Sequence, residues 1–385
     1  MGLDLTERYI PFNKPYFGKS SSIELSKVLE SDKFSGDGPM TGLATSKLIE
    51  VMDVPNALLT TSCTQSLELS SLLLDLKPGD EVIMPAFNFT SQAIAVANFG
   101  AIPVFVDINR KTKNIDFKKI GSAISLKTRA ISVVNYAGIA CDFDDIREVA
   151  SKSDLVVIED NAHGLGGALN GRRLGSFGDI SVQSFHDTKN IQCGEGGSIT
   201  FNNLKFLDRA KVLREKGTNR QAFLDGQVDK YSWVDLGGSY LLSDILAAIL
   251  LGQLAEFQEI QNSRIQIWNA YQNALQIWAE KNRFEVPHIP QGNSNTAHMF
   301  YLIAPSKKVR DHFISRLSEK GIDARFHYQA LHNTKAGIKF GRVVEECEVA
   351  ESIAETLVRL PLWYGMKEEE ISQVIDGVLE FSENS

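Results

Sequence analysis

The segment Val182-Gln183-Ser184-Phe185-His186-Asp187-Thr188-Lys189-Asn190 begins as a strand-like run and ends in a polar cluster with one lysine. The glycine-rich run 194–197 follows it. A lysine that forms an imine needs a lowered pKa and a fixed approach to its carbonyl partner, and the end of a buried strand can supply both. Ser184 and Thr188 are small donors that could reach a phosphate. Taken alone, the segment also fits a surface loop with an ordinary solvated lysine.

The sequence before this segment alternates short apolar runs with stretches of helical periodicity. We expect strands at 57–59, 81–84, 104–106, 131–134 and 155–158, with helices between them. Such alternation predicts an α/β fold with a largely parallel sheet that helices cover on both faces. Ligands of these sheets gather at the carboxyl ends of the strands, so polar residues at those ends are the candidate site residues.

One such strand ends in Ile158-Glu159-Asp160-Asn161-Ala162-His163. Pyridoxal-5′-phosphate (PLP) needs a carboxylate against its pyridine nitrogen, because a protonated nitrogen lets the ring accept electrons. Asp160 is the candidate, since Glu159 should point to the opposite face of the strand. His163 could stack on the ring or bond its phenolic oxygen. The alternative is that Asp160 merely caps a helix.

Two further strand ends carry candidate cofactor contacts. Thr60-Thr61-Ser62-Cys63-Thr64-Gln65-Ser66 precedes an apolar helix, and a helix start with free N–H groups can bind a phosphate. Phe89, in the segment 85–90, could stack on the cofactor ring. The alternatives are a plain helix cap for the first segment and a core aromatic residue for Phe89.

Composition limits the class of protein. The 385 residues carry a formal net charge of −8, which implies no broad basic surface for nucleic acid or membrane lipid. The four cysteines, at 63, 141, 193 and 347, are too far apart for a zinc or iron–sulfur motif and suit a reducing compartment. The N-terminus lacks the apolar core of a signal peptide, and no apolar run is long enough to span a bilayer. We therefore expect a cytoplasmic enzyme without a metal site.

The pattern changes near residue 240, where a nearly continuous helical stretch is expected to about residue 279. Mixed strand and helix patterns follow to the C-terminus. The expected organisation is an N-terminal arm over 1–20, a large cofactor-binding domain over 21–255 and a smaller α+β domain over 256–385.

In this order, the segments resemble the DegT/DnrJ-type family of sugar-nucleotide aminotransferases, which are fold-type I PLP enzymes. The resemblance covers nearly the whole chain. The segments that carry it, besides the lysine segment, are Arg214-Glu215-Lys216-Gly217-Thr218-Asn219-Arg220, Gly226-Gln227-Val228-Asp229-Lys230-Tyr231-Ser232-Trp233, Phe326-His327-Tyr328 and Leu331-His332. It implies a mostly parallel, seven-stranded type of sheet sandwiched by helices, with a smaller C-terminal domain.

The resemblance also implies roles for single residues. Lys189 holds PLP as a Schiff base and carries the proton, and Asp160 pairs with the pyridine nitrogen. The other implied cofactor contacts are His163 near the phenolic oxygen, Cys63 and Thr64 in the phosphate loop, Ser184 at the phosphate and Phe89 over the ring. On the substrate side, the family pattern implies His327 and His332.

The sequence departs from the family pattern at one position. Family members commonly place an asparagine before the helix near 240, where it reaches the phosphate of the neighbouring subunit. This chain has Ser239 there, and Leu241 replaces a basic residue. Arg220 or Lys230 could compensate.

The implied reaction is a two-stage transamination. L-Glutamate, the expected amino donor, aminates the cofactor, which then aminates the 4-keto group of a thymidine diphosphate (dTDP)-linked 6-deoxyhexose for surface polysaccharide or O-antigen. The galacto epimer of the 4-amino-4,6-dideoxyhexose is preferred, while the gluco epimer and a 3-amino product stay open. The resemblance also implies a homodimer with shared active sites.

Two competing functions follow from the same residues. Related PLP dehydratases replace the lysine by histidine, and some add an iron–sulfur cluster, which the presence of Lys189 and the scattered cysteines disfavour. A non-catalytic sugar-nucleotide binder or regulator could keep the fold, because fold alone never establishes activity. That alternative predicts loss of Lys189 or Asp160, and both are retained.

Overall fold

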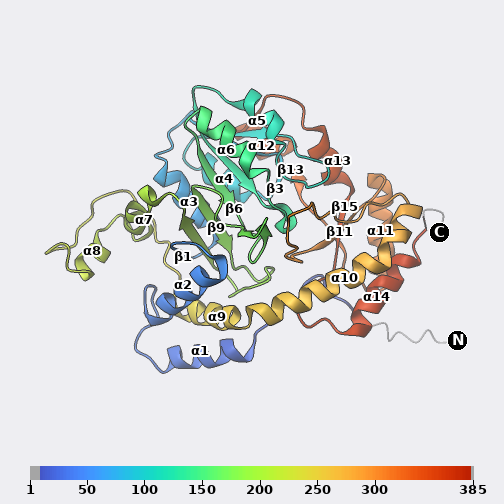
Figure 1. Cartoon of the computed structure of the whole chain (residues 1–385), viewed down its shortest axis with the longest axis horizontal. Coiled ribbons are helices and arrows are strands. Elements are labelled where there is room, and N and C mark those ends of the chain that lie inside the picture. The colour runs from blue at the N-terminus through green and yellow to red at the C-terminus, as the bar shows by residue number, and fades with distance from the viewer. Residues whose placement is uncertain (1–8, 383–385) are drawn as a thin grey trace.

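The computed structural model describes residues 9–382 of the chain (Figure 1). The first eight residues of the predicted arm lie outside this range. The rest of the arm is extended, with an isolated bridge between Ile10 and Ile322. Asn13 donates a hydrogen bond to the carbonyl of Asp187, at 3.2 Å. The arm therefore crosses from the C-terminal part of the chain to the lysine segment.

A large sheet forms the centre of the molecule, in the order β1-β10-β9-β6-β5-β2-β4-β14. Its strands are β1 (Leu58–Thr60), β10 (Gly197–Phe201), β9 (Ile180–Ser184), β6 (Val156–Asp160), β5 (Thr128–Val134), β2 (Glu81–Pro85), β4 (Ile102–Val106) and β14 (Arg342–Val343). In this sheet, β10 is antiparallel to both neighbours, and the remaining neighbouring pairs are parallel. The predicted mostly parallel sheet is confirmed, with the two-residue β14 added at one edge.

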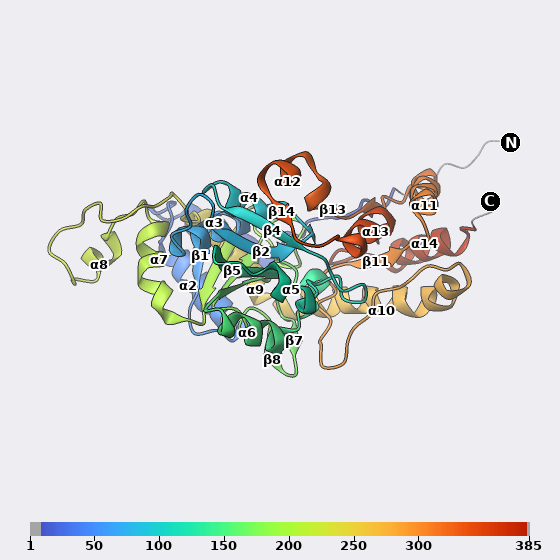
Figure 2. The same ribbon diagram turned by 90° about the horizontal axis from the view of Figure 1, so that it is seen from above.

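Helices cover both faces of the sheet because successive strand residues point to opposite sides. Val82 and Met84 of β2 pack with α3 (Cys63–Leu73), α4 (Ser91–Ala97) and α7 (Leu207–Arg214). Ile83, between them, packs with α5 (Phe117–Ala123) and α6 (Phe143–Lys152). The two faces thus carry separate apolar cores. Figure 2 shows α3 and α4 on one side of the sheet and α5 and α6 on the other.

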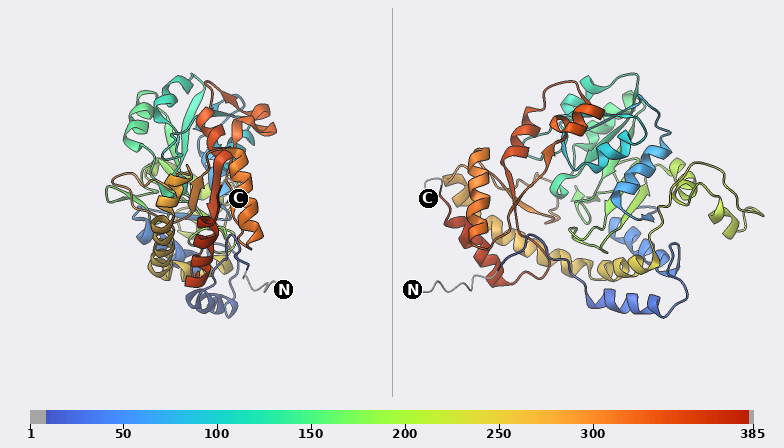
Figure 3. Two further views of the ribbon diagram at one scale, coloured as in Figure 1. Left: turned by 90° about the vertical axis from the view of Figure 1, so that its right-hand side faces the viewer. Right: turned by 180° about the vertical axis from the view of Figure 1, so that it is seen from behind.

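The helical stretch predicted from 240 to 279 is two helices rather than one. Ser243 caps α9 (Asp244–Ala255), and α10 (Phe257–Lys281) follows after Glu256. The carboxylate of Glu256 accepts a hydrogen bond from the backbone N–H of Ser20, at 2.9 Å. Glu256 thereby anchors the start of α1 (Lys19–Leu29), which lies along α9 (Figure 3). Helix α2 (Pro39–Met52) packs on α9 as well.

Beyond α10, a second sheet has the order β11-β15-β12 and its own apolar core. Its strands are β11 (Phe300–Ile303), β15 (Leu357–Leu360) and β12 (Arg325–Phe326), and its helices include α11 (Lys307–Glu319) and α14 (Glu368–Leu379). The remaining elements of this segment are β13 (Gln329–Ala330), α12 (Lys335–Phe340) and α13 (Glu348–Thr356). The predicted boundary at 255/256 stays a prediction, because β13 and β14 pair with β3 (Phe87–Asn88) and β4 of the earlier part.

Within residues 9–382, no helix combines the length and apolar character that crossing a membrane requires.

Candidate active site

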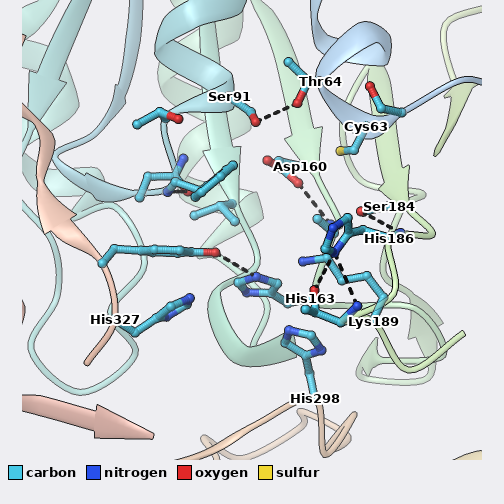
Figure 4. A pocket seen from close by; sticks show the side chains of 18 of the residues that line it. Cys63, Thr64, Ser91, Asp160, His163, Ser184, His186, Lys189, His298 and His327 are labelled. Carbon is cyan, nitrogen blue, oxygen red and sulfur yellow. Dashed lines mark hydrogen bonds between the residues drawn. The ribbon is translucent and has the colours of Figure 1, made fainter. Parts of the chain in front are cut away.

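A cavity of about 530 Å³ lies where several strands of the large sheet end. Val134 at the end of β5, Asp160 at the end of β6 and Ser184 at the end of β9 all line it. Its opposite wall comes from residues 326–329 and Arg359, in the C-terminal part of the chain. Figure 4 shows Asp160, Lys189 and His163 directed into this cavity. The ends of these strands therefore line one cavity, as the alternating pattern predicted.

Lys189 follows β9 in a loop that backbone hydrogen bonds hold in place. The N–H of Lys189 donates to the carbonyl of His186, at 2.9 Å, and the N–H of Asp187 donates to that of Gly194, at 3.0 Å. Burial lowers the pKa of Lys189 to about 8, against the opposing effects of Cys63 and Asp160. A lysine with this pKa is partly neutral near physiological pH, so it is not the solvated surface lysine of the alternative interpretation.

Asp160 is buried at the end of β6 with both carboxylate oxygens engaged. Its Oδ1 accepts from the N–H of Ala162 at 3.0 Å, and its Oδ2 accepts from Nε2 of Gln92 at 3.3 Å. Burial raises the pKa of Asp160, while these hydrogen bonds and Lys189 act in the opposite direction. Sequence reasoning missed Gln92, although a glutamine on the buried side of an apolar helix was a usable signal.

Glu159 points to the other face of β6, as the alternation predicted. Its carboxylate accepts from Asn135 at 2.8 Å and from the backbone N–H groups of Gly175, Phe177 and Gly178 at 2.6, 2.8 and 2.9 Å. These bonds tie the loop after β8 (Arg172–Arg173) to the sheet. The two adjacent acids therefore have different roles: Glu159 binds the backbone of residues 175–178, and Asp160 lines the cavity.

We expect Glu159→Ala to lower the free energy of unfolding by about 3–5 kcal/mol, because it leaves buried donors without an acceptor. Glu159→Gln should cost less, since one acceptor oxygen remains. Urea unfolding followed by circular dichroism measures both. Glu148→Ala, at an exposed position, is the control and should leave the unfolding midpoint unchanged. A wild-type midpoint for Glu159→Ala would contradict the structural role.

His163 is buried and lies against a second imidazole. Its Nδ1 accepts from the N–H of Ala137 at 3.3 Å, so the neutral ring carries its proton on Nε2, 3.2 Å from the hydroxyl of Tyr328. The ring of His298 stacks on it, with centroids 4.4 Å apart. Burial lowers the pKa of both imidazoles well below the usual range, so both are neutral at physiological pH.

Asn190, next to the lysine, determines which nitrogen of His298 carries the proton. The amide nitrogen of Asn190 donates to Thr296 O and Gln261 Oε1, at 2.8 and 3.1 Å, which leaves its oxygen to accept from His298 Nδ1 at 3.0 Å. His298 Nε2 is then an unprotonated acceptor. Sequence reasoning missed His298, because a histidine 109 positions after Lys189 gives no local signal.

Polar groups suited to a phosphate lie at the start of α3. Ser62 caps the helix through the N–H of Gln65, at 3.1 Å, so the preceding N–H groups of Cys63 and Thr64 have no partner within the helix. The Thr64 hydroxyl bonds to that of Ser91, at 2.7 Å. Burial raises the pKa of the Cys63 thiol well above its ordinary value, so it is a neutral group here. Ser184 lines the same cavity.

The chain is similar to known proteins along nearly its whole length. The model of the DegT/DnrJ/EryC1/StrS aminotransferase family matches residues 16–379. The chain belongs to this family. The spore coat polysaccharide biosynthesis protein SpsC of Bacillus subtilis is 30% identical over 379 residues, which cover 96% of each chain.

Two solved structures extend the match to three dimensions. The aminotransferase TlmJ of Streptoalloteichus hindustanus superposes with a TM-score of 0.89 at 27% identity, over 97% of this chain and 98% of that one. Spr1654 of Streptococcus pneumoniae, solved in its PLP form, gives a TM-score of 0.88 at 27% identity, over 96% and 98%. The chain is accordingly a fold-type I, PLP-dependent sugar aminotransferase.

The cavity of this aminotransferase fits PLP by its donor set. A lysine with lowered pKa faces a buried carboxylate, and the first turn of α3 offers N–H groups and hydroxyls at the far end. Among the described residues, Nδ2 of the cavity residue Asn88 is buried without a hydrogen-bond partner. When bound, PLP supplies an aldehyde for the lysine amine and an electron-accepting ring.

Two further predicted residues, Phe89 and His327, also line the cavity. Phe89 is half-exposed at its rim, 5.8 Å from the ring of Tyr328. His327 Nδ1 lies 2.9 Å from the hydroxyl of Tyr136. Their positions are compatible with the predicted cofactor and substrate sides.

The four other predicted residues of this aminotransferase do not line the cavity. His332 turns away to bond Glu351 at 3.0 Å, so we no longer assign it to the substrate. Arg220 pairs with Glu215 at 3.3 Å, and Lys230 and Ser239 are exposed. These last three lie on the segment after α7, which includes α8 (Arg220–Leu224) and projects from the body (Figures 1 and 2).

Sequence reasoning also missed Arg359, a basic residue inside the apolar strand β15, which lines the cavity. Among the described residues, no group of three or more histidine, cysteine, aspartate or glutamate side chains could hold a metal ion.

Proposed function

We propose that this chain transfers the amino group of L-glutamate to C4 of a dTDP-linked 4-keto-6-deoxyhexose. The product is a dTDP-4-amino-4,6-dideoxyhexose, with the galacto epimer preferred. The observation that carries the proposal is one lysine of lowered pKa and one buried carboxylate lining a single cavity. The combination of segments 184–190, 214–220, 226–233 and 326–328 supports the sugar class, because it is typical of such 4-aminotransferases.

Each residue has a proposed task. Lys189 binds the cofactor and moves a proton between the cofactor C4′ and the sugar C4. Asp160 holds a proton on the pyridine nitrogen, and Gln92 orients the carboxylate of Asp160. His163 Nε2 orients the phenolic side of the ring, while Cys63, Thr64 and Ser184 bind the phosphate. Phe89 covers the ring, and His327 contacts the sugar.

The configuration of the product at C4 depends on which face of the sugar receives the proton from Lys189. Lys189 reaches the cofactor from one side, so the orientation of the bound sugar fixes the configuration at C4. Incubation of the purified enzyme with dTDP-4-keto-6-deoxyglucose, L-glutamate and PLP should give one 4-amino product, and the NMR couplings of its C4 proton should assign it as galacto. The gluco epimer would correct the epimer alone, whereas a 3-amino product would overturn the C4 assignment.

A homodimer with shared active sites is part of the proposal. Large apolar side chains on the projecting segment, including Leu224, Tyr231 and Trp233, are exposed and would be covered by a second copy. Arg220, Lys230 and Ser239 lie on the same segment and could reach the partner's cofactor phosphate or substrate. A monomer mass by light scattering would contradict this arrangement.

The proposed setting is the cytoplasmic stage of surface polysaccharide synthesis. All four cysteines are free, which suits a reducing compartment. The name of the relative SpsC supports a polysaccharide pathway. Cell fractionation with an activity assay tests the location, and activity confined to the membrane fraction would contradict it.

A further inference from the structure

His298 presents an unprotonated nitrogen to the catalytic cavity. Its Nδ1 donates to Oδ1 of Asn190, at 3.0 Å, so Nε2 carries a lone pair and no proton. The side chain is buried in the chain but lines the cavity. Among residues 9–382, Nε2 makes no hydrogen bond. A free acceptor in such a place is suited to a donor that turns toward it during the reaction.

The ring of His298 is held in one position. Arg264 of α10 donates to the backbone carbonyls of Ala297 and His298, at 3.1 and 2.8 Å. Ala297 has a φ of 46°, a left-handed conformation that a non-glycine residue keeps only where its surroundings hold it. The imidazole of His163 stacks on the ring, with centroids 4.4 Å apart (Figure 4). These contacts, with that of Asn190, fix the place of Nε2.

The amine of Lys189 is the donor that the structure brings to this ring. Lys189 and His298 line the catalytic cavity together, and both also line a smaller adjoining space with Asn190. Asn190 follows Lys189 in the chain, so its bond to His298 ties the imidazole to the backbone of the lysine segment. Nζ of Lys189 makes no hydrogen bond to another residue of the described range, so it is able to turn toward Nε2.

The other groups around Lys189 are engaged or are poor acceptors. The titratable side chains that face it are Cys63, Asp160, His163, His298, His327 and Arg359. Both carboxylate oxygens of Asp160 already accept hydrogen bonds. The neutral thiol of Cys63 is a weak acceptor, and Nε2 of His163 carries a proton. His298 combines a free lone pair with an anchor beside the lysine.

We propose that His298 is a positioning residue for Lys189: its Nε2 accepts a hydrogen bond from the lysine amine whenever that amine is not bound to the cofactor. A neutral amine has two N–H groups and one lone pair, and it rotates about its carbon–nitrogen bond. A hydrogen bond from one N–H to Nε2 directs the lone pair, which takes the proton from the α-carbon of the amino donor. The ammonium keeps this bond until it passes the proton to C4′ of the cofactor, which returns the amine to its neutral form. The inference rests on the proposed role of Lys189.

The enzyme without PLP tests the contact with a readout that needs no activity. Acetic anhydride acetylates only neutral amines, so the pH dependence of acetylation at Lys189, followed by peptide mass spectrometry, gives the pKa of this amine. An acceptor at Nε2 stabilises the ammonium, so its removal should lower the pKa further below its ordinary value. His298→Phe, which keeps a flat ring beside His163, should move the midpoint down by about one pH unit. His298→Gln, which keeps an acceptor, should stay near wild type.

The step with L-glutamate gives a second readout on the PLP-loaded enzyme. His298→Phe should lower the rate at saturating L-glutamate about 10- to 100-fold, the scale of one hydrogen bond to a charged group. The L-glutamate concentration for half the maximal rate should change by less than about twofold, because the donor does not contact His298. His298→Gln should recover most of the rate. His288→Phe, at an exposed histidine, is the matched control and should behave as wild type.

Asn190→Leu separates hydrogen bonding from the filling of space. This variant keeps the imidazole but removes the acceptor of its Nδ1 proton, so the proton is free to move to Nε2. We expect a lowered midpoint for Lys189 and a slower step with L-glutamate, although the ring is present. Melting temperature and bound PLP, measured on every variant, identify a folding defect. If His298→Phe fails to fold, the comparison of Asn190→Leu and His298→Gln decides: a wild-type midpoint in both would overturn the proposal.

The remaining outcomes distinguish this inference from the proposed function. A wild-type midpoint and rate in folded His298→Phe would show that the ring only fills space, and would overturn the inference while the role of Lys189 stands. A raised requirement for L-glutamate at an unchanged maximal rate would assign His298 to the donor and overturn it as well. Amino transfer that survives in Lys189→Ala would contradict the proposed function, whereas the midpoint shift in His298→Phe would still establish the contact.

Discussion

Lys189→Ala is expected to abolish amino transfer, with a loss of at least roughly 10⁴-fold in kcat, because one amine both binds the cofactor and moves the proton. The purified variant should also lack the absorbance band of covalently bound PLP. The remaining contacts at Asp160, Ser184 and α3 are unchanged, so PLP should still bind, but reversibly. Equilibrium dialysis and the steady-state rate measure the two effects separately.

Lys189→Arg is the control for charge. It keeps a cation at the end of β9, so a loss as large as that of Lys189→Ala would show that the reactive amine is required and not the positive charge. A variant without Lys189 that keeps more than a few per cent of the wild-type rate would contradict the assignment. Such a result would show that a group other than Lys189 carries out the catalysis.

Asp160→Asn is expected to reduce kcat by about 10²- to 10³-fold, equivalent to about 3–4 kcal/mol, the scale of losing one partner of a buried charge pair. An asparagine also offers an N–H₂ group where Asp160 has only acceptors. That group would meet either the N–H of Ala162 or Nε2 of Gln92, both of which donate. Stopped-flow measurement of the step with L-glutamate isolates the effect from product release.

Gln92→Leu is the companion variant for Asp160. It leaves the carboxylate and removes one of its donors, so we expect about a tenfold loss, from one charge-assisted hydrogen bond. Wild-type kinetics in Asp160→Asn would mean that the ring nitrogen does not need a charged partner. An equal loss of kcat in Asp160→Asn and Gln92→Leu would mean that the orientation of the Asp160 side chain matters and its charge does not.

The parallel sheet was predictable because each of its strands can be recognised from a few consecutive residues. Each buried strand is a short apolar run, and each run ends in polar residues such as Asp160 or Ser184 at the edge where ligands bind. The alternation of side chains also separated Glu159 from Asp160 correctly. The break at Glu256 was missed, and the contact of its carboxylate with the N–H of Ser20, 236 positions earlier, gives no local signal.

The missed site residues share a physical reason. His298 and Arg359 line the cavity, and Gln92 acts on it through its hydrogen bond to Asp160, so these residues come from three separate parts of the chain that only the folded structure brings together. The sequence neighbours of His298 and Arg359 are ordinary core residues, which gives them no local signal. His332 was assigned to the site because it follows a segment that reaches the cavity. Its imidazole instead lies beside Glu351, outside the cavity.

We expect Lys189, and no other lysine, to bind the cofactor. A lowered pKa alone does not decide this, because burial also lowers the pKa of Lys113 to about 8, and its ammonium lies 5.2 Å from the ring of Tyr301. Borohydride reduction of the PLP-loaded enzyme, followed by peptide mass spectrometry, fixes and locates the cofactor. We predict the pyridoxyl mass on the peptide that contains Lys189. The same mass on the Lys113 peptide, with Lys189 unmodified, would contradict the account.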